Sequence, residues 1–549
     1  MWQRILSLVL SFGLVAFGQP ALCPGCGLVA AVGGYALLWI AISTVKHPFW
    51  VATLWYTAVQ LVQLVWFVSH PYLYIWGVYL SLSLALGLQF GLMSWLVRRE
   101  ALGCLWKVAA LAGFWTLLEG ARLFFLSGFS WNPVGLALTG NTYPLQMASI
   151  AGIYGLSFWV MLTNGLVYRA YFLKKGWVLV ALAALFPYVF GWAHLTYHER
   201  EIEKHPPKEV SALLVQTAFP IEECLDCPPE DLVAYVEGEW REILQLLKGH
   251  EGEKLDLIAL PEYVVPFGTW ADVWKKERVE ALFEELFGAR GLAALAATEM
   301  RQTLVSNAYI LQGIATLFDV DVISGLEDAE QKGDRVEHYN AALHFKPGGE
   351  GENPNYDKRY AKRVLVPMGE YIPFEWCRDL AARYGIAGSF TPGEGATVFQ
   401  GKKGAYGLSI CYEETYAHLM RENKLKGADV LLNLTSDVWY PNSRLPQQHL
   451  DHARLRALEG GLPLLRACNT GVTCGIDSLG RTVKSLGNDE WRKEALFVKL
   501  PLYGYSTLYT KTGDTFVMGF SGILVLLMFL PRLCAFFELI FGEKLPPAK

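Results

Sequence analysis

The chain has 549 residues, 53% of them hydrophobic, and it carries 47 Lys and Arg against 52 Asp and Glu, for a formal net charge of −5. This length exceeds one ordinary hydrophobic core, so two or more domains are expected. The acidic balance and the lack of a long basic run argue against a nucleic-acid partner. Ten scattered cysteines are too few for a disulfide-stapled scaffold.

Apolar segments of spanning length, or close to it, dominate the first third of the chain. Seven lie there and an eighth lies near the C-terminus: 4–18, 24–43, 49–68, 73–96, 104–126, 146–170, 177–196 and 515–541. We interpret the first as an uncleaved span, because Leu22 is large where a lipoprotein cleavage box needs a small residue and six more spans follow. The sequence therefore predicts a polytopic α-helical membrane domain of eight spans, seven N-terminal plus one C-terminal.

Basic residues predict how these spans are oriented. The connections at 19–23, 69–72 and 127–145 contain no Lys or Arg. Basic residues mark the alternate ends instead, namely Arg4, Lys46, Arg98 with Arg99, and Lys174 with Lys175. By the positive-inside rule, both termini are expected in the cytoplasm and residues from about 198 to 510 on the outside.

Candidate strands and helices alternate through the external part of the chain. Strands are expected at 212–216, 257–260, 320–324, 340–345, 407–410, 430–434 and 464–467, and helices near 230–248, 275–299 and 445–460. This mixture predicts a layered α/β domain. The expected parts are a membrane domain at 1–198, a charged linker at 199–209, the α/β domain at 210–510, and a last transmembrane helix with its tail at 511–549.

Three reactive side chains lie at the ends of strand-like segments. Residues 257–260 lead to Glu262, residues 407–410 lead to Cys411, and Lys362 precedes the strand-like run 364–367. Alone, Cys411 would fit a buried core thiol. With the other two, a carboxylate can take the thiol proton, an ammonium can stabilise an oxyanion, and the thiolate can attack a carbonyl. The order Glu262, Lys362, Cys411 along the chain therefore predicts thiol acyl-transfer chemistry.

Two charged residues lie within the fifth predicted span. Glu119 and Arg122 are three residues apart, so a helix would place them on one face. Ionisable groups at membrane depth are functional or paired with each other. The sequence leaves both roles open.

Two C-x-x-C pairs stand out among the cysteines, Cys23/Cys26 and Cys224/Cys227. Neither has a second pair or a histidine cluster beside it at metal-ligand spacing, so no metal site is expected. A local disulfide at Cys224/Cys227 would fit a domain outside the cytoplasm.

The three reactive segments resemble the nitrilase superfamily, and longer matches resemble the apolipoprotein N-acyltransferase family, membrane enzymes that finish bacterial lipoproteins. The matches run in family order at 260–262, 362–373, 410–413, 436–439, 449, 453–459, 463–466 and 469–471. The resemblance implies an α/β nitrilase-like αββα sandwich that needs no cofactor. It also implies a triad of Glu262 as proton acceptor, Lys362 at the oxyanion and Cys411 as nucleophile.

The same resemblance implies supporting residues around the triad. Glu370 would support the lysine, Asn340 would lie near the site, and Tyr412 and Glu413 would flank the nucleophile. On the residues alone, Glu370 fits a surface carboxylate better, and Asn340 fits an ordinary strand-edge amide equally well.

Trp439 lies on a segment that resembles the mobile loop over the acyltransferase site. The family's usual aromatic-glycine continuation is replaced here by Tyr440, Pro441 and Asn442. The sequence therefore leaves the motion of this loop open.

The activity that the resemblance implies is transfer of a fatty acyl chain from a phospholipid, with phosphatidylethanolamine expected. The acceptor would be the α-amino group of the N-terminal diacylglyceryl-cysteine of an apolipoprotein, reached through a Cys411 thioester in a ping-pong scheme. The protein would be a monomer in the lipid bilayer of the bacterial inner membrane, with its catalytic domain in the periplasm.

Two other functions remain open from the sequence. A membrane-tethered nitrilase-type amidase would use the same three residues to hydrolyse a carbon–nitrogen bond, although seven spans exceed what an anchor needs. A transporter or a scaffold with a binding domain would carry polar residues through several spans. Such residues are scarce apart from Glu119 and Arg122.

Overall fold

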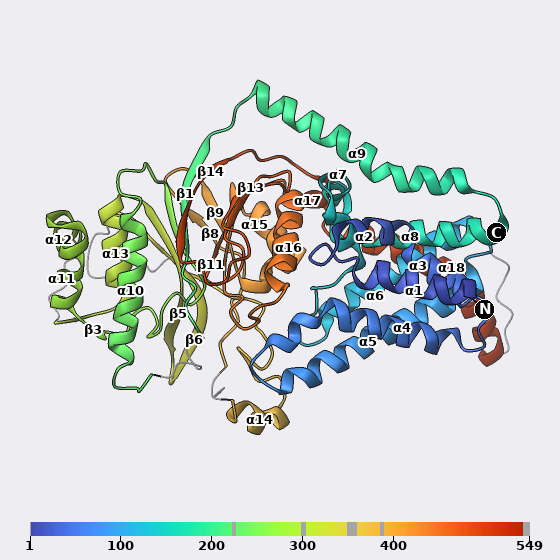
Figure 1. Ribbon diagram of the computed structural model, residues 1–549, viewed down its shortest axis with the longest axis horizontal. Helices are drawn as coiled ribbons and strands as arrows, with labels where there is room; N and C mark the ends of the chain where they lie inside the picture. The colour runs from blue at the N-terminus through green and yellow to red at the C-terminus, as the bar shows by residue number, and fades with distance from the viewer. Residues whose placement is uncertain (1, 222–226, 298–302, 349–358, 385–388, 542–549) are drawn as a thin grey trace. The chain divides into compact units, whose positions relative to one another are not determined.

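The computed structural model describes residues 2–221, 227–297, 303–348, 359–384 and 389–541. The chain forms two compact units, shown in Figure 1. The helical unit comprises residues 1–68, 73–196 and 511–549, and the α/β unit comprises residues 69–72 and 197–510.

Each apolar segment of the sequence is helical in the helical unit. The helices are α1 (Trp2–Ala16), α2 (Pro24–Val29), α3 (Tyr35–Ala41), α4 (Pro48–Gln63), α5 (Tyr74–Glu100), α6 (Leu105–Ala121), α8 (Ala148–Leu173), α9 (Trp177–Lys204) and α18 (Thr515–Phe541). A π-helical turn, Ala30–Gly34, joins α2 to α3. Because α9 continues to Lys204, the first half of the predicted linker is helical.

Several of these helices could cross a membrane. Within the described residues, five stretches are long and apolar enough: Pro24–Ala41, Tyr74–Glu100, Ala148–Leu173, Trp177–Lys204 and Thr515–Arg532. The helices α1, α4 and α6 have 15, 16 and 17 residues and are shorter than a usual span. The count of eight spans therefore stays a prediction.

Two six-stranded sheets form the centre of the α/β unit. The first has the order β14-β1-β2-β5-β6-β7 and the second the order β13-β12-β11-β10-β9-β8. The first sheet consists of β1 (Glu209–Gln216), β2 (Leu257–Leu260), β5 (Asp321–Lys332), β6 (Arg335–Phe345), β7 (Arg359–Ala361) and β14 (Glu494–Pro501). The second consists of β8 (Val398–Gln400), β9 (Ala405–Ile410), β10 (Val430–Thr435), β11 (Leu464–Cys468), β12 (Cys474–Ile476) and β13 (Thr482–Ser485).

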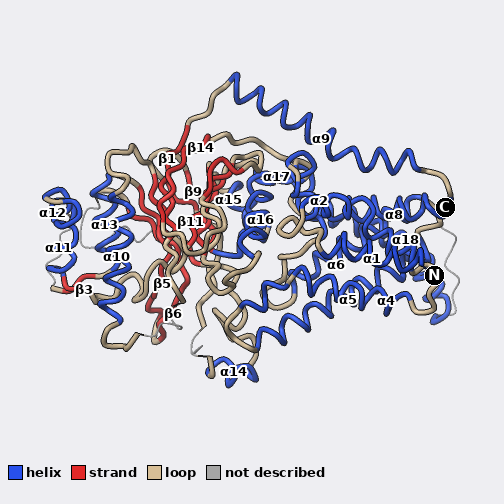
Figure 2. Tube along the Cα trace, in the orientation of Figure 1, coloured by secondary structure: helices blue, strands red, loops and turns tan. Residues whose placement is uncertain are grey.

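Alternation of side chains along the strands explains the layers. In β1, Ala212 and Leu214 join the core between the sheets, whereas Leu213 and Val215 join the core beneath the outer helices. That outer core includes α10 (Leu232–Lys248), α11 (Lys276–Phe287), α12 (Ala289–Ala296) and α13 (Asn307–Phe318). On the far face of the second sheet lie α15 (Ala417–Leu425) and α16 (Leu445–Gly460), as Figure 2 shows. The predicted αββα sandwich is confirmed.

Parallel strands direct the predicted site residues to strand ends. β1, β2 and β5 are mutually parallel in the first sheet, as are β9, β10 and β11 in the second. Glu262 follows β2 by two residues, and Cys411 follows β9 directly. The carboxyl ends of such strands are where α/β proteins place their sites.

Two predicted elements differ from the structure. The run 364–367 is not a strand, and Lys362 instead follows β7, the edge strand that pairs with β6. The expected helix at 275–299 is two helices, α11 and α12, because Gly288 interrupts it with a φ of +62°, and its last two residues lie outside the described part of the chain.

Candidate active site

Cys411 lies on a strained turn at the end of a buried strand. It opens a 3₁₀ turn, Cys411–Thr415, with a φ of +52°, a region that residues other than glycine seldom occupy. On the neighbouring strand β10, the Asn433 side-chain nitrogen donates to the Cys411 carbonyl and to Ser409 Oγ, both at 3.0 Å. These bonds hold the strained backbone in place, so the thiol is presented at the sheet edge.

Glu413 ties this turn to the segment that follows Lys362. Its fully buried carboxylate accepts hydrogen bonds from the backbone N–H of Ile410 at 2.8 Å, of Arg363 at 2.6 Å and of Val364 at 3.1 Å. The Tyr360 hydroxyl donates to it at 2.8 Å. Because those N–H groups bond to a carboxylate, residues 363–364 do not join a sheet ladder, which explains the missing strand.

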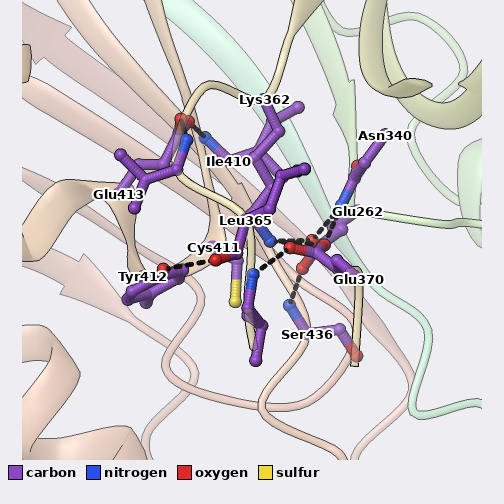
Figure 3. Close-up of polar contacts among 12 residues, drawn as sticks. Glu262, Asn340, Lys362, Leu365, Glu370, Ile410, Cys411, Tyr412, Glu413 and Ser436 are labelled. Atoms are coloured by element: carbon purple, nitrogen blue, oxygen red, sulfur yellow. Dashed lines mark hydrogen bonds and ion pairs between the residues drawn. The ribbon is translucent and has the colours of Figure 1, made fainter. Parts of the chain in front are cut away.

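Tyr412 makes a second tie to the same segment. Its hydroxyl donates to the Leu365 carbonyl at 3.0 Å, and the Lys362 ammonium lies 5.6 Å from the centre of its ring (Figure 3). That distance lies within the range of a cation–π contact. The predicted neighbours of the nucleophile thus position the lysine relative to the turn.

Lys362 lies between two carboxylates in a group that we call the front cluster. Its Nζ is 3.0 Å from Glu262 Oε1 and 2.8 Å from Glu370 Oε1. Asn340 Nδ2 donates to the same two oxygens at 2.8 and 2.7 Å, and Figure 3 shows these side chains converging. The front cluster is therefore Glu262, Asn340, Lys362 and Glu370, and the surface interpretation of Glu370 is wrong, since only 11% of its side chain is exposed.

The backbone holds Glu262 from two further directions. Its second oxygen, Oε2, accepts the N–H of Ser436 at 3.1 Å. Behind it, a Cβ on Gly325 would lie 2.6 Å from the Glu262 Cα and from the Pro261 carbonyl oxygen, so only glycine allows β5 to approach this closely. The carboxylate is consequently fixed before any substrate binds.

Burial and charge set the protonation of the front cluster. Burial raises the pKa of Glu262, and the Lys362 charge only partly opposes this. Burial would lower the pKa of Lys362, but Glu262 and Glu370 outweigh burial and hold that pKa well above its ordinary value. Lys362 is therefore an ammonium at neutral pH.

The nucleophile is a neutral thiol in this environment. Although part of Cys411 is exposed, its thiol lies deep enough that burial, followed by the nearby Glu262 charge, raises its pKa well above the ordinary value. Lys362 opposes that shift without cancelling it. Attack by Cys411 thus requires a base, and the raised pKa of Glu262 suits it to accept the proton.

Glu119 and Arg122 do not form the ion pair that their spacing allowed. The helix α6 ends at Ala121, and Arg122 begins a 3₁₀ turn. Within the described residues, no ion pair joins the two. Glu119 Oε1 instead accepts the Trp115 indole N–H and the Val134 N–H, both at 2.8 Å.

Arg122 has its own partners in the helical unit. Its Nε donates to Gln89 Oε1 at 2.9 Å, and its guanidinium lies 5.3 Å from the centre of the Trp115 ring. Like Glu119, it is buried. Arg122 Nη1 also donates to the Asn132 carbonyl at 3.5 Å, so both residues bond the backbone at 132–134, and a direct chemical role for either stays a prediction.

Trp439 and the C-x-x-C cysteines are not members of the front cluster. Trp439 is in the connection between β10 and α16, where it stacks on His70, a residue of the same unit, with the ring centres 5.5 Å apart. The Cys23 and Cys26 sulfurs are 2.7 Å apart at the start of α2. Cys224 lies outside the described residues, so the Cys224/Cys227 pair stays a prediction.

Sequence reasoning assigned no role to a second group of charges in the α/β unit, which we call the back cluster. Its members are Glu414, Asp437, His449 and Arg466. One feature of the sequence could have indicated this cluster: Arg466 is the single charged residue in the otherwise apolar strand 464–468. A charge in a buried strand needs a charged or polar partner.

The comparisons with known proteins cover nearly the whole chain. The carbon-nitrogen hydrolase family model matches residues 227–508, and the model for the apolipoprotein N-acyltransferase N-terminal domain matches residues 11–166. An apolipoprotein N-acyltransferase of Chlamydia pneumoniae is 33% identical, with coverage of 93% of this chain and 94% of the relative. One of Chlamydia caviae is 32% identical, with coverage of 95% and 96%.

Among solved structures, Saccharomyces cerevisiae Nit3, a member of branch 10 of the nitrilase superfamily, matches 54% of this chain and 90% of its own length. The sequence identity is 16% and the TM-score is 0.35.

Proposed function

Because this chain belongs to the apolipoprotein N-acyltransferase family, it is a membrane enzyme that N-acylates lipoproteins, and we propose that Cys411, Glu262 and Lys362 carry the reaction. The observation that carries the assignment is the Lys362 ammonium, held between two carboxylates next to the strained Cys411 turn. This arrangement supports the assignment of Glu262 as proton acceptor, Lys362 as oxyanion partner and Cys411 as nucleophile.

In the first half-reaction, Cys411 Sγ attacks the ester carbonyl of a phospholipid acyl chain while Glu262 takes the thiol proton. The carbonyl oxygen becomes an oxyanion beside Lys362. When the tetrahedral intermediate collapses, the carbon–oxygen bond breaks, and Glu262 returns its proton to the departing lysophospholipid. The acyl chain remains as a thioester on Cys411.

In the second half-reaction, the α-amino group of a diacylglyceryl-cysteine attacks the thioester. Glu262 takes a proton from the amine, the carbon–sulfur bond breaks, and the thiolate recovers a proton from Glu262. The product is an amide and the enzyme returns to its starting state. Glu262 thus alternates between base and acid in each half-reaction.

Lys362 has the hydrogen-bonding capacity that this scheme needs. An ammonium has three N–H donors, and two of them are directed to Glu262 and Glu370. The third remains for the substrate oxyanion. In a site that excludes water, one such charged donor contributes several kcal/mol of transition-state stabilisation, on the order of 3 kcal/mol.

We further propose the topology and substrates expected from the sequence. Residues 1–198 and 511–549 would provide eight spans, with both termini in the cytoplasm, and the linker and domain at 199–510 would face the periplasm of a monomeric inner-membrane protein. Support comes from Arg98 and Arg99 in the last turn of α5 and from Lys174 at the end of α8. Protease protection in intact and opened cells tests this, and a cytoplasmic α/β unit would refute it.

The decisive experiment on the chemistry is intact-protein mass spectrometry. The detergent-purified chain and Cys411→Ala are incubated with phosphatidylethanolamine, the proposed donor. We expect a fatty-acyl adduct that hydroxylamine removes, that a diacylglyceryl-cysteine peptide discharges, and that is absent from Cys411→Ala. The partly buried Cys227, which is outside the site, gives a matched control as Cys227→Ala and should retain the adduct.

Two results would overturn the proposal. Without an adduct on Cys411, the nucleophile assignment fails. If water clears the adduct as fast as the peptide does, the residues support a hydrolase of the amidase type instead.

A further inference from the structure

The back cluster includes Glu414, a residue of the nucleophile turn. Glu414, three residues after Cys411, is 3.2 Å from Arg466 Nη1 and 3.3 Å from His449 Nε2, measured from Glu414 Oε1. His449 Nδ1 is hydrogen-bonded to Asp437 Oδ1 at 3.0 Å. All four residues are at least 96% buried. The histidine thus bridges two carboxylates from different segments.

The second of those segments leads to the catalytic base. Asp437 directly follows Ser436, whose N–H donates to Glu262 Oε2. Asn469 Nδ2 donates to Ser436 Oγ at 3.2 Å, and the Asp437 N–H donates to the Thr470 carbonyl at 3.1 Å. The Ser436 N–H belongs to the peptide before Ser436, so His449 is linked to Glu262 through the Asp437 side chain and the backbone of Ser436.

A neighbouring glycine shows how little room Asp437 has. Gly471 has a φ of +126°, and a Cβ at that position would lie 2.8 Å from Asp437 Oδ2. The Asp437 carboxylate is therefore confined on one side by the 469–471 turn and on the other by His449. This geometry fixes Asp437, and with the Asn469 bond to Ser436 Oγ it restrains the Ser436 backbone, whose N–H bonds Glu262.

We infer that His449 is a positioning residue for the acyl-transfer site: by holding Asp437 against the nucleophile turn, it keeps the Ser436 N–H on Glu262. This inference rests on the proposed role of Glu262 as the proton acceptor for Cys411. The contacts of His449 that carry this inference are with Asp437 and Glu414. Its effect passes through the Asp437 side chain and one backbone N–H.

Substitutions that mimic only one ring nitrogen of His449 can distinguish a positioning role from a packing role. The amide nitrogen of an asparagine side chain can occupy the place of Nδ1 and that of a glutamine the place of Nε2. His449→Asn therefore keeps a nitrogen beside Asp437 Oδ1 and removes the one beside Glu414 Oε1, and His449→Gln does the opposite. Both variants leave one buried carboxylate without its imidazole partner.

The test measures two rates for each variant of the full-length chain in detergent. One is single-turnover acylation of Cys411 by saturating phosphatidylethanolamine, and the other is alkylation of Cys411 by iodoacetamide, which needs no lipid. We expect His449→Gln to lower both rates by about 10- to 100-fold, because a misplaced catalytic group costs that much. We expect His449→Asn to stay within about threefold of the natural chain, as for the loss of one hydrogen bond.

His452→Asn provides the matched control, since His452 is also buried and lies one turn later on α16. Thermal unfolding of each variant is measured in parallel, and rates are compared only for the folded fraction. The control should retain both rates to within about threefold.

Equal rates for His449→Asn and His449→Gln would overturn the inference, as would a loss of rate fully explained by unfolding. Failure of the natural chain to form an acyl adduct would refute the proposed function instead. In that case the alkylation rates still decide the role of His449.

Discussion

The front and back clusters both connect to the nucleophile turn, the first through the 363–365 segment and the second through Glu414, yet their charges are arranged differently. The front cluster sets one cation between two carboxylates, so acid is in excess. The back cluster sets an arginine and a histidine against two carboxylates, so acid and base are matched in number. An excess carboxylate with a raised pKa can accept a proton, whereas a matched buried group holds its shape. The front cluster is suited to chemistry and the back cluster to positioning.

Removing the cation of the front cluster should have the largest effect. Lys362→Met takes away the oxyanion partner and leaves Glu262 and Glu370 without their counter-ion. We expect single-turnover acylation of Cys411 to fall by about 10³-fold or more, as for the loss of a charged oxyanion donor. Mass spectrometry of the acyl adduct over time measures this.

Lys402→Met is the matched control for that experiment. Lys402 pairs with Asp319 at 2.7 Å and is 41% exposed, so its loss should leave acylation within about twofold. If Lys362→Met acylates as fast as this control, the lysine does not serve the oxyanion.

The same kind of change in the back cluster should affect stability first. Glu414→Gln removes one carboxylate and leaves Arg466 buried without its charge partner, which costs about 3–5 kcal/mol of unfolding free energy. Because the bond between His449 and Asp437 persists, acylation by the folded fraction should change much less than in Lys362→Met. Denaturant unfolding followed by near-ultraviolet circular dichroism, together with single-turnover rates, checks both statements. A stable variant with strongly reduced acylation would contradict the contrast between the clusters.

A methyl group added beside Asp437 should destabilise the back cluster by a smaller amount. Gly471→Ala places a methyl group against Asp437 and demands a φ of +126°, so we expect about 1–3 kcal/mol of destabilisation. The control is Gly487→Ala, where φ is +81° and nothing lies within 4 Å of the added Cβ. Thermal unfolding of both variants separates backbone strain from the contact with Asp437. Equal losses would show that the contact has no effect.

The smallest expected effect is a shift in the midpoint of the pH dependence of acylation. The base must be unprotonated to act, so acylation should rise as pH rises through the pKa of Glu262, which burial places above the ordinary 4.5. The negative charge of Glu370 contributes to that elevation, so Glu370→Gln should move the midpoint to lower pH. Single-turnover rates from pH 4 to 8 measure both curves. A midpoint at or below 4.5 in the natural chain would mean that another group is the base.

Much of the site could be predicted because its chemistry lies at strand ends. Glu262 and Cys411 each follow a short apolar run, and the structure confirms strands at 257–260 and 405–410. The strand expected after Lys362 is absent because the backbone N–H groups of that segment bond to the Glu413 and Glu370 side chains instead of to a neighbouring strand. Local composition cannot reveal that side-chain carboxylates, rather than a neighbouring strand, accept these hydrogen bonds.

Long-range pairings were also beyond the sequence. β14 pairs with β1 along its full length although almost three hundred residues separate them, and nothing local indicates that partnership. The back cluster likewise joins four separate segments. Glu119 and Arg122 both contact Trp115, as one helix face allows, but their other partners, Val134 and Gln89, come from outside α6 and could not be predicted from spacing.

The unequal exposure of the two reactive groups governs how this enzyme responds to covalent reagents. Lys362 has only 1% of its side chain exposed and remains protonated, so acylating probes that label nucleophilic lysines should pass it by. Cys411 is partly exposed and has a base beside it, so a thiol-directed electrophile with an acyl-like tail should react there selectively. An inhibitor of this enzyme would accordingly be designed around the sulfur, with the lysine used only as a hydrogen-bond donor to the warhead's oxygen.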